Sequence, residues 1–214
     1  MSRLPTPAWR GRVVYERALK EQRRRREGVL EGAPEAFWLL EHPAVLTAGR
    51  RSVQQVPSSE WLRARGLRVV PTERGGLLTW HGPGQLVGYL IVDLGRLGLG
   101  SRRFVHAVEQ GLIDWLQTVD VAAGRRDGLH GVWSTGGKIA SIGLHIRHHV
   151  TLHGFSLNLD PDLSVFDGFT ACGVIGGKTT SVREQTGRLW TPQDASRAVG
   201  QAVCSAIQRA SVDT

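Results

Sequence analysis

The chain has 214 residues, of which 41% are hydrophobic and 21% charged, and its formal net charge is +8. This composition is typical of a folded globular protein and excludes a disordered or fibrous chain. No apolar run reaches the ~18 residues that a membrane span needs. No charged-then-apolar signal peptide opens the sequence, so we expect a cytoplasmic protein.

The first predicted element is a helix from about Trp9 to Glu27, with Val14, Tyr15 and Ala18 on its inner side. Its basic cluster, Arg23 to Arg26, has two interpretations. It is either a solvated helix face, which the flanking glutamates favour, or a docking surface for an acidic protein or a nucleic acid.

Short β-prone runs broken by glycine follow the first helix. They are Phe37 to Glu41, Leu67 to Val70, Leu77 to Trp80 and Leu86 to Leu94. A second helix is predicted after Ser101 as its N-cap, because apolar residues then recur every three or four positions. These residues are Phe104, Val108, Leu112, Trp115 and Val119.

A second β-rich block spans Gly131 to Leu159, and a third helix is predicted to begin at Thr191-Pro192. One face of this helix consists of Ala195, Val199, Val203 and Ile207. Strand runs on either side of a central helix predict an α/β or α+β fold, with a mixed β-sheet flanked by helices. We expect a single domain over residues 1–214.

The segment from Arg74 to Gln85 contains four glycines and a proline, with Arg74 and His81 as fixed polar groups. Such a segment either brings backbone close to a ligand or forms a glycine-rich hairpin with an incidental histidine. Both interpretations stay open at this point.

Lys138 follows two glycines but does not belong to a phosphate-binding loop. The motif GxxxxGK[ST] needs glycine and Ser or Thr where this chain has Val132 and Ile139. The similar run Gly176-Gly177-Lys178-Thr179 fails because position 172 is cysteine. Lys138 is then either a base whose pKa partial burial lowers, or a strand-end lysine that reaches solvent.

The two cysteines, Cys172 and Cys204, are expected to be free thiols, and their spacing lacks the CxxC pattern of a zinc site. Cys204 belongs to the apolar face of the last helix, which indicates packing. Cys172 precedes a glycine in a loop-like region and is either an inert buried residue or a nucleophile. A nucleophile needs a nearby cation or base, for which Lys138, His81 and His153 are candidates.

Three ordered segments closely resemble the octanoyl-[acyl carrier protein]:protein N-octanoyltransferases, the lipoate-protein ligase B family of the biotin/lipoate protein ligase superfamily. They are RGGLLTWHGPGQLVGYLIVDL at 74–94, GGKIASIGLHIRHHVTLHGFSLNL at 136–159 and ACG at 171–173, with a weaker match of EHPAVLTAGR at 41–50. The resemblance extends over positions 10 to 210.

The resemblance implies a fold and a reaction. The fold is a mixed sheet flanked by helices. Octanoate passes from acyl carrier protein to Cys172 as a thioester, and then to a lysine of a lipoyl domain, while Lys138 activates the thiol. The implied acceptors are the lipoyl domains of 2-oxoacid dehydrogenases and glycine cleavage proteins. No cofactor, metal, nucleic acid or membrane is implied, and we expect a monomer.

The resemblance also assigns substrate contacts. They are Arg74, Gly75, Gly76, Leu77, Leu78, Thr79, Trp80, His81, Ser141, Ile142, Gly143, Gly154, Phe155 and Ser156. Gly143 and Gly154 are expected to leave room for an eight-carbon chain. Trp80 stands where the family commonly has tyrosine and is expected to narrow the pocket.

Two other functions remain in competition. A lipoate or biotin protein ligase would activate its acid with ATP and would not need Cys172. A non-catalytic basic binding protein would bind more weakly as salt rises and would be indifferent to changes at Cys172.

Overall fold

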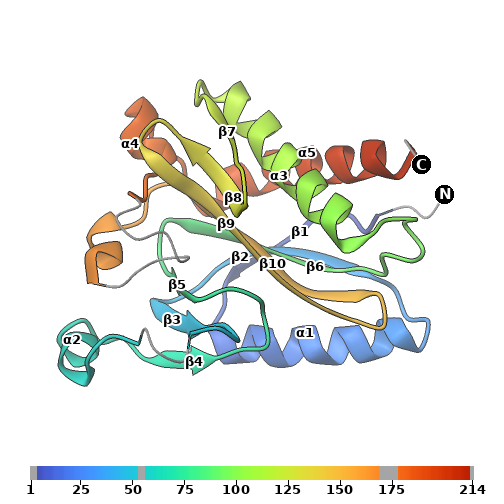
Figure 1. Ribbon diagram of the computed structural model, residues 1–214, viewed down its shortest axis with the longest axis horizontal. Helices are drawn as coiled ribbons and strands as arrows, with labels where there is room; N and C mark the ends of the chain where they lie inside the picture. The colour runs from blue at the N-terminus through green and yellow to red at the C-terminus, as the bar shows by residue number, and fades with distance from the viewer. Residues whose placement is uncertain (1–3, 53–55, 169–177, 213–214) are drawn as a thin grey trace.

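The computed structural model describes residues 4–52, 56–168 and 178–212. Its main feature is a mixed seven-stranded sheet in the order β1-β2-β6-β10-β9-β8-β7 (Figure 1). The strands are β1 (Ala8–Arg12), β2 (Ala36–Glu41), β6 (Gln85–Ile91), β7 (Ala123–Arg126), β8 (Leu129–Ser134), β9 (Gly137–Arg147) and β10 (Val150–Asn158). Among these seven strands β1 and β2 pair in parallel, and the other neighbours pair antiparallel. The predicted mixed sheet with flanking helices is confirmed.

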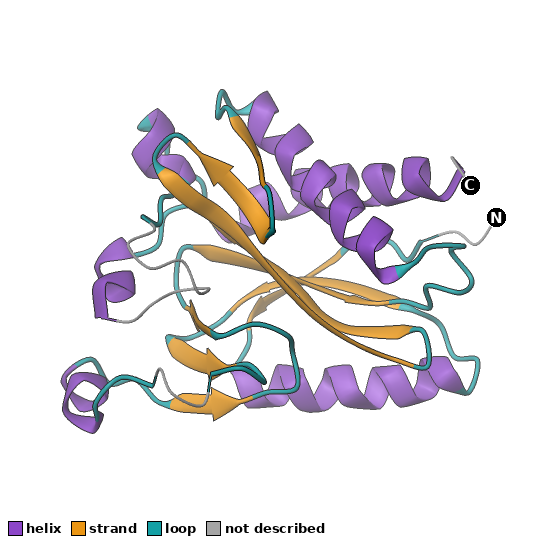
Figure 2. Cartoon of the chain, viewed as in Figure 1, coloured by secondary structure: helices purple, strands orange, loops and turns teal. Residues whose placement is uncertain are grey.

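Helices cover both faces of the sheet. On one face lie α3 (Ser101–Thr118) and α5 (Pro192–Val212), and on the other lies α1 (Tyr15–Leu30) (Figures 1 and 2). Apolar residues of α3 and α5, such as Leu112 and Val203, join the larger core cluster. Ala18 of α1 belongs to a second cluster on the opposite face. The sheet is therefore buried on both sides, and β2, β6 and β10 are buried along their whole length.

A second sheet of three strands lies beside α1. Its order is β4-β3-β5, with β3 (Val45–Ala48), β4 (Val69–Pro71) and β5 (Leu78–His81). The remaining elements are short: α2 (Ser59–Ala64), the 3-10 helix η1 (Leu163–Gly168) and α4 (Val182–Thr186). In the described ranges 4–52, 56–168 and 178–212, the helices lack the combination of length and apolar character that crossing a membrane requires.

The first helix begins later than the sequence predicts. Trp9 to Arg12 belongs to strand β1, which pairs with β2, and α1 starts only at Tyr15. Tyr15 and Ala18 are buried as expected, but Val14 is 48% exposed because it precedes the helix. The edge strand was missed because its pairing partner lies nearly thirty residues away in the sequence.

The basic cluster on α1 is only partly a solvated face. Arg24 is exposed, but Arg23 makes a bidentate ion pair with Glu73 at 2.9 Å. Arg26 is buried, with its Nη1 3.1 Å from Nδ1 of His145. The cluster thus holds α1 against β9 and the Arg74 segment as well as facing solvent.

The two other predicted helices are confirmed, with one correction. Gly100 rather than Ser101 is the N-cap of α3, and no side chain caps that end. Helix α5 begins at Pro192, and Thr191 accepts a hydrogen bond from the Asp194 amide at 3.2 Å. Its predicted inner residues are all fully buried: Ala195, Val199, Val203 and Ile207.

Candidate active site

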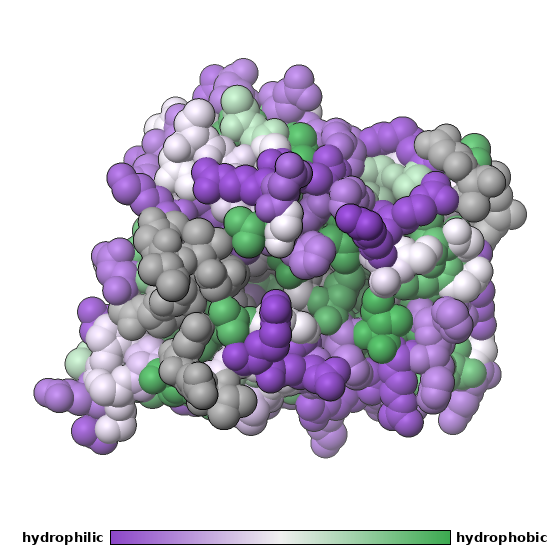
Figure 3. Space-filling model, in the orientation of Figure 1, coloured by the Kyte–Doolittle hydropathy of each residue, from purple (hydrophilic) through white to green (hydrophobic). Residues whose placement is uncertain are grey.

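A cavity of about 470 Å³ opens between the central strands and the small sheet. Its walls come from β5, β6, β8, β9 and β10, from α3 and the start of α1, and from the loop before β5. In the space-filling view, apolar side chains lie recessed in the middle of this face, with hydrophilic ones around them (Figure 3). The β9–β10 hairpin, registered from Arg147 opposite Val150 to Ala140 opposite Leu157, supplies much of one wall.

Most of the residues that the sequence singled out meet at this cavity, although they come from three separate segments. They are Arg74, Gly75, Gly76, Leu77, Leu78, Thr79, His81, Lys138, Ser141, Ile142, Gly143, Gly154, Phe155 and Ser156. Trp80 does not line it. The Trp80 ring packs instead in the core of the small sheet, 5.8 Å from the ring of Phe166. Cys172 lies outside the described residues.

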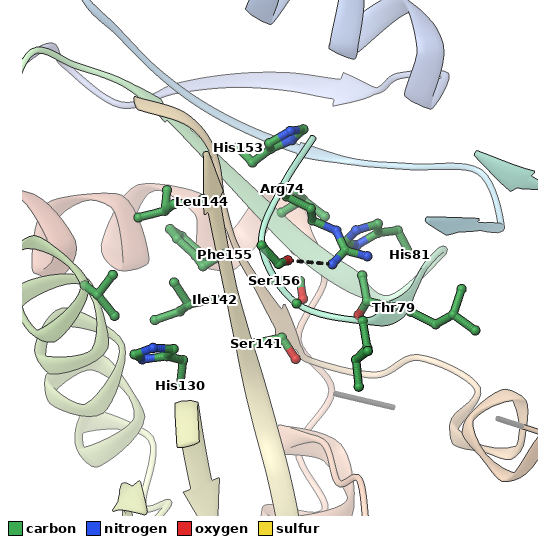
Figure 4. Close-up of a pocket in the computed structure, with 18 of the residues that line it drawn as sticks. Arg74, Thr79, His81, His130, Ser141, Ile142, Leu144, His153, Phe155 and Ser156 are labelled. Carbon is green, nitrogen blue, oxygen red and sulfur yellow. Dashed lines mark hydrogen bonds between the residues drawn. The ribbon is translucent and has the colours of Figure 1, made fainter. Parts of the chain in front are cut away.

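The cavity has a polar side and an apolar side. Arg74, Thr79 and His81 face it from the β5 side, with Ser141 and Ser156 close by (Figure 4). Ile142, Leu144 and Phe155 occupy the opposite side. Such a division suits a ligand with one polar reactive end and an apolar tail.

Lys138 is the second residue of strand β9, and its side chain crosses the neighbouring strand β8. Nζ lies 4.8 Å from the centroid of the Trp133 ring, a cation–π geometry. Gly131 makes this path possible, because a β-carbon there would lie 2.7 Å from Cε of Lys138. The aromatic ring and the missing side chain together direct the lysine toward the cavity.

The Lys138 backbone is held by the chain that follows Cys172. Its N–H donates to the Lys178 carbonyl at 2.8 Å, and its own carbonyl accepts from Thr180 N–H at 3.0 Å. These bonds form a parallel bridge between Lys138 and Thr179. The described chain resumes at Lys178, six residues after Cys172.

Arg74 is buried at the polar side of the cavity. Its guanidinium donates to the Thr47 carbonyl at 2.7 Å, to Thr47 Oγ1 at 2.8 Å and to the Gly75 carbonyl at 3.1 Å. The last of these bonds is drawn in Figure 4. Gly49 must lack a side chain because a β-carbon would lie 2.8 Å from Nη1 of Arg74.

His81 starts a line of hydrogen bonds that crosses the sheet. Its Nδ1 lies 2.7 Å from Oε1 of Gln85, whose Nε2 donates to Oδ1 of Asn158 at 2.8 Å. Nδ2 of Asn158 donates to the Thr180 carbonyl at 3.0 Å. Burial, and next the neighbouring His42 ring and the Arg74 guanidinium, hold the pKa of His81 well below its usual value, so the ring is neutral.

Two tyrosines and a histidine that the sequence reasoning missed complete the polar side. Tyr15 and Tyr89 line the cavity, and the Tyr15 ring stacks on His81 with centroids 6.0 Å apart. His42 lies behind them, with Nδ1 2.6 Å from the Val13 carbonyl and Nε2 2.8 Å from Tyr89 Oη. Burial lowers the pKa of His42 to about 4 and raises that of Tyr15 to about 12. His42 belongs to the sequence EHPAVLTAGR at 41–50, the weaker match to the family. That match was the only signal in the sequence that could have pointed to His42 as a site residue.

His153, a candidate base in the sequence, lines the cavity but is constrained by the fold. It adopts a positive φ of 66° in the middle of β10. Its amide donates to Oε1 of Gln22 at 2.9 Å, and its ring faces Glu73 with Nε2 3.8 Å from Oε2. The backbone of His153 is therefore tied to α1, while its ring faces the segment that carries Arg74.

The two glycines expected to leave room for a chain have other reasons to be small. A β-carbon at Gly154 would strike the Gly88 carbonyl of the adjacent strand. A β-carbon at Gly143 would lie 3.2 Å from Cδ of Arg74. Their size therefore permits the close approach of β6 and of Arg74 to the hairpin.

The second cysteine, Cys204, lies outside the cavity. Cys204 packs half-buried on α5, as predicted, with Sγ 4.0 Å from the Pro5 carbonyl. Over the described residues, His, Cys, Asp and Glu side chains form no group of three or more suited to a metal ion.

Comparisons with known proteins give a consistent picture. The family model "Lipoyl protein ligase A/B catalytic domain" matches residues 14–204. An octanoyltransferase of Geobacter metallireducens is 42% identical over 190 residues, covering 88% of this chain and 87% of that protein. One of Thiobacillus denitrificans is 40% identical over 200 residues, covering 92% and 88%.

Solved structures share the fold at low identity. P. falciparum LipL1 in complex with lipoate has a TM-score of 0.70 at 9% identity, covering 98% of this chain and 63% of that one. A putative lipoate protein ligase from T. acidophilum with bound lipoic acid has a TM-score of 0.67 at 14% identity, covering 97% and 86%. The family model spans most of the chain, and the curated relatives exceed a third of identical positions over nearly all of it. The chain therefore belongs to the lipoyl protein ligase A/B catalytic domain family.

Proposed function

We propose that the protein is an octanoyltransferase that moves an octanoyl group from acyl carrier protein to the lysine of a lipoyl domain. The observation that carries the proposal is the cavity that joins an apolar wall to Lys138 and to residues of the segments 74–81 and 141–156. Relatives at 40% identity and above that are named octanoyltransferase support the same reaction.

Cys172 is the proposed nucleophile. Its thiolate attacks the thioester carbonyl of the donor, the C–S bond to the carrier thiol breaks, and the octanoyl group remains on Cys172. One flanking contact supports its nearness to the cavity: the Lys178 carbonyl accepts a hydrogen bond from the backbone N–H of Lys138, which lines the cavity. The six residues from Cys172 to Lys178 span at most roughly 20 Å even when fully extended.

Lys138 is the proposed acid and base. It takes the proton of the Cys172 thiol in the first half-reaction and gives it to the departing carrier thiolate, which leaves Lys138 neutral again. In the second, the amine of the lipoyl lysine attacks the octanoyl carbonyl, the Cys172 thiolate leaves, and Lys138 accepts the proton that the amine nitrogen loses. Thioester exchange onto a thiol needs no nucleotide.

The apolar side of the cavity is the proposed site of the acyl chain. Ile142, Leu144 and Phe155 would bury it, and each buried methylene contributes about 0.8 kcal/mol. The proposed partners are octanoyl-acyl carrier protein and the lipoyl domains of 2-oxoacid dehydrogenases and glycine cleavage proteins, met by a monomer in the cytoplasm.

Intact-protein mass spectrometry tests the covalent step. The protein is mixed with octanoyl-acyl carrier protein without ATP and gains the mass of one octanoyl group, which a lipoyl domain then removes. Cys172→Ala should gain nothing, whereas the matched control Cys204→Ala should load normally. If no adduct forms and ATP with free octanoate restores transfer, the protein is a ligase instead.

Variants of Lys138 test its role. Lys138→Ala should slow loading of Cys172 by at least about a hundredfold, the range for loss of an acid or base. Lys138→Arg keeps the charge over Trp133 but is a far weaker base, so it should slow loading comparably. A loading rate close to that of the unchanged protein would remove Lys138 from the mechanism.

A further inference from the structure

A buried amide relay fixes which nitrogen of His81 carries a proton. The relay ends at the carbonyl of Thr180, which can only accept a hydrogen bond. Asn158 must therefore present its nitrogen to Thr180 and its oxygen to Gln85. Gln85 in turn presents its nitrogen to Asn158 and its oxygen to His81.

The consequence is a single tautomer of His81. Since Oε1 of Gln85 only accepts, Nδ1 of His81 must carry the proton, and the neutral ring keeps a lone pair on Nε2. Within the described part of the chain, Nε2 has no hydrogen-bond partner, while the ring lines the cavity.

A second group on the same side is also an acceptor. Nδ1 of His42 lies 2.6 Å from the Val13 carbonyl, so it carries the ring proton and leaves Nε2 to accept from the Tyr89 hydroxyl at 2.8 Å. With its proton directed at His42, Tyr89 offers the cavity only oxygen lone pairs. The His42 ring lies between the two, with centroids 5.8 Å from His81 and 5.9 Å from Tyr89.

Two neighbouring acceptors, Nε2 of His81 and the oxygen of Tyr89, suit a ligand group that brings N–H groups. On the proposed reaction, the attacking amine of the acceptor lysine is the substrate group richest in N–H, and it must turn its own lone pair toward the octanoyl carbonyl. Acceptors that hold its N–H groups would direct that lone pair.

We propose that Nε2 of His81, fixed by Gln85 and Asn158, accepts a hydrogen bond from the attacking amine and orients it in the second half-reaction. His81 thus contacts substrate, whereas Gln85 and Asn158 are positioning residues that act through it. His81 takes no proton in this step. The inference rests on the proposed octanoyltransferase function.

The charged and titratable surroundings of His81 allow a pH-based test. Arg74, His42, His153 and Tyr15 face the ring, and none offers it a carboxylate. Gln85→Glu would add one at Nδ1, favour the imidazolium and so convert Nε2 from an acceptor to a donor at low pH. It would also remove the donor to Asn158. Gln208→Glu, on the exposed face of α5, is the matched control.

The experiment measures two single-turnover rates from pH 6 to pH 9: loading from octanoyl-acyl carrier protein, and discharge of the isolated octanoyl-enzyme to a lipoyl domain. Gln85→Glu should discharge at least about tenfold more slowly than the unchanged protein at pH 6, the loss of one hydrogen bond to the reacting group. The difference in discharge rate between Gln85→Glu and the unchanged protein should shrink as the pH rises. The two proteins should load at the same rate. Gln208→Glu should follow the unchanged protein in both arms.

Equal losses in both arms at every pH would mean a structural role for Gln85 and would overturn the inference, as would a deficit confined to loading. Failure of the unchanged protein to load would instead contradict the proposed function. Nitrogen-15 NMR of the unchanged protein gives a check that does not depend on a variant. It should find His81 protonated at Nδ1 alone at pH 7, and protonation at Nε2 would overturn the inference.

Discussion

The Cys204 thiol lies half-buried on α5, where burial raises its pKa to about 11. Since the thiolate is the reactive form, Cys204 is protonated and inert at neutral pH. We therefore predict that iodoacetamide at pH 7.5 modifies Cys172 and leaves Cys204 unreacted, as read by peptide mass spectrometry. Alkylation of Cys204 before Cys172 would contradict the proposed assignment of the nucleophile.

His42 makes stability depend on pH. Its pKa is about 4 in the folded protein and about 6.5 in an unfolded chain, so only the unfolded chain takes up a proton between these values. Stability is then full above pH 6.5 and falls as the pH drops, by roughly 3 kcal/mol at pH 4 from this residue alone.

Urea unfolding of the protein and of His42→Gln from pH 4 to 7.5 measures this contribution. Because His81 and His153 also have lowered pKa values, both proteins should lose stability in acid. The variant should lose less, and a difference between the two that stays constant with pH would show that His42 does not titrate in this way.

At the level of elements, the β9–β10 hairpin turns through two histidines in an unusual backbone. Arg147 pairs with Val150, and the two residues between them, His148 and His149, have φ of 48° and 65°. This is the backbone of a type I′ turn, which Asn-Gly adopts most readily.

Replacing His148-His149 by Asn-Gly should therefore raise the free energy of unfolding, by about 1 kcal/mol, because the left-handed conformation costs most residues other than Gly and Asn roughly 1–2 kcal/mol each. Both side chains are exposed, and the His149 carbonyl that accepts from Leu94 is kept. Chemical denaturation checks the gain. A loss of stability would mean that one of the imidazole rings makes a contribution of its own.

Sequence patterns predicted the elements whose signals are local. The start of α5 follows from Pro192 and from the Thr191 hydroxyl, and its inner face from a helical repeat within one segment. Strand β1 was predicted as helix because its identity depends on pairing with β2, and nothing within its five residues reveals that partner.

The same distinction holds for the site. Motifs placed Arg74, Lys138 and Phe155 at a common cavity, but they did not reveal the relay from His81 to Thr180, because its members come from β5, β6, β10 and the chain before α4. Trp80 shows the opposite failure: it lies within a motif, yet its side chain packs in the small sheet.

At the level of the whole molecule, the net charge of +8 should speed association with an acidic acyl carrier protein. Raising NaCl from 50 to 500 mM should then lower kcat/KM for octanoyl-acyl carrier protein by roughly tenfold or more, since screening shortens the range of the attraction. Octanoyl-pantetheine, which has no net charge, serves as the control donor and should react at a nearly constant rate. An equal effect on both donors would place the salt dependence in the chemical step.

On the proposed function, strand β9 carries both the residue that activates the thiol and the residues that bound the acyl tail. Lys138 stands at its start, and Ile142, Leu144 and Ile146 line the cavity from alternate positions further on, about 7 Å apart along the strand. A mutation at one of the distant positions would alter the space for an acyl tail without moving the lysine. Substitutions during evolution can thus change the preferred length of the acyl chain stepwise, without loss of the ability to catalyse transfer.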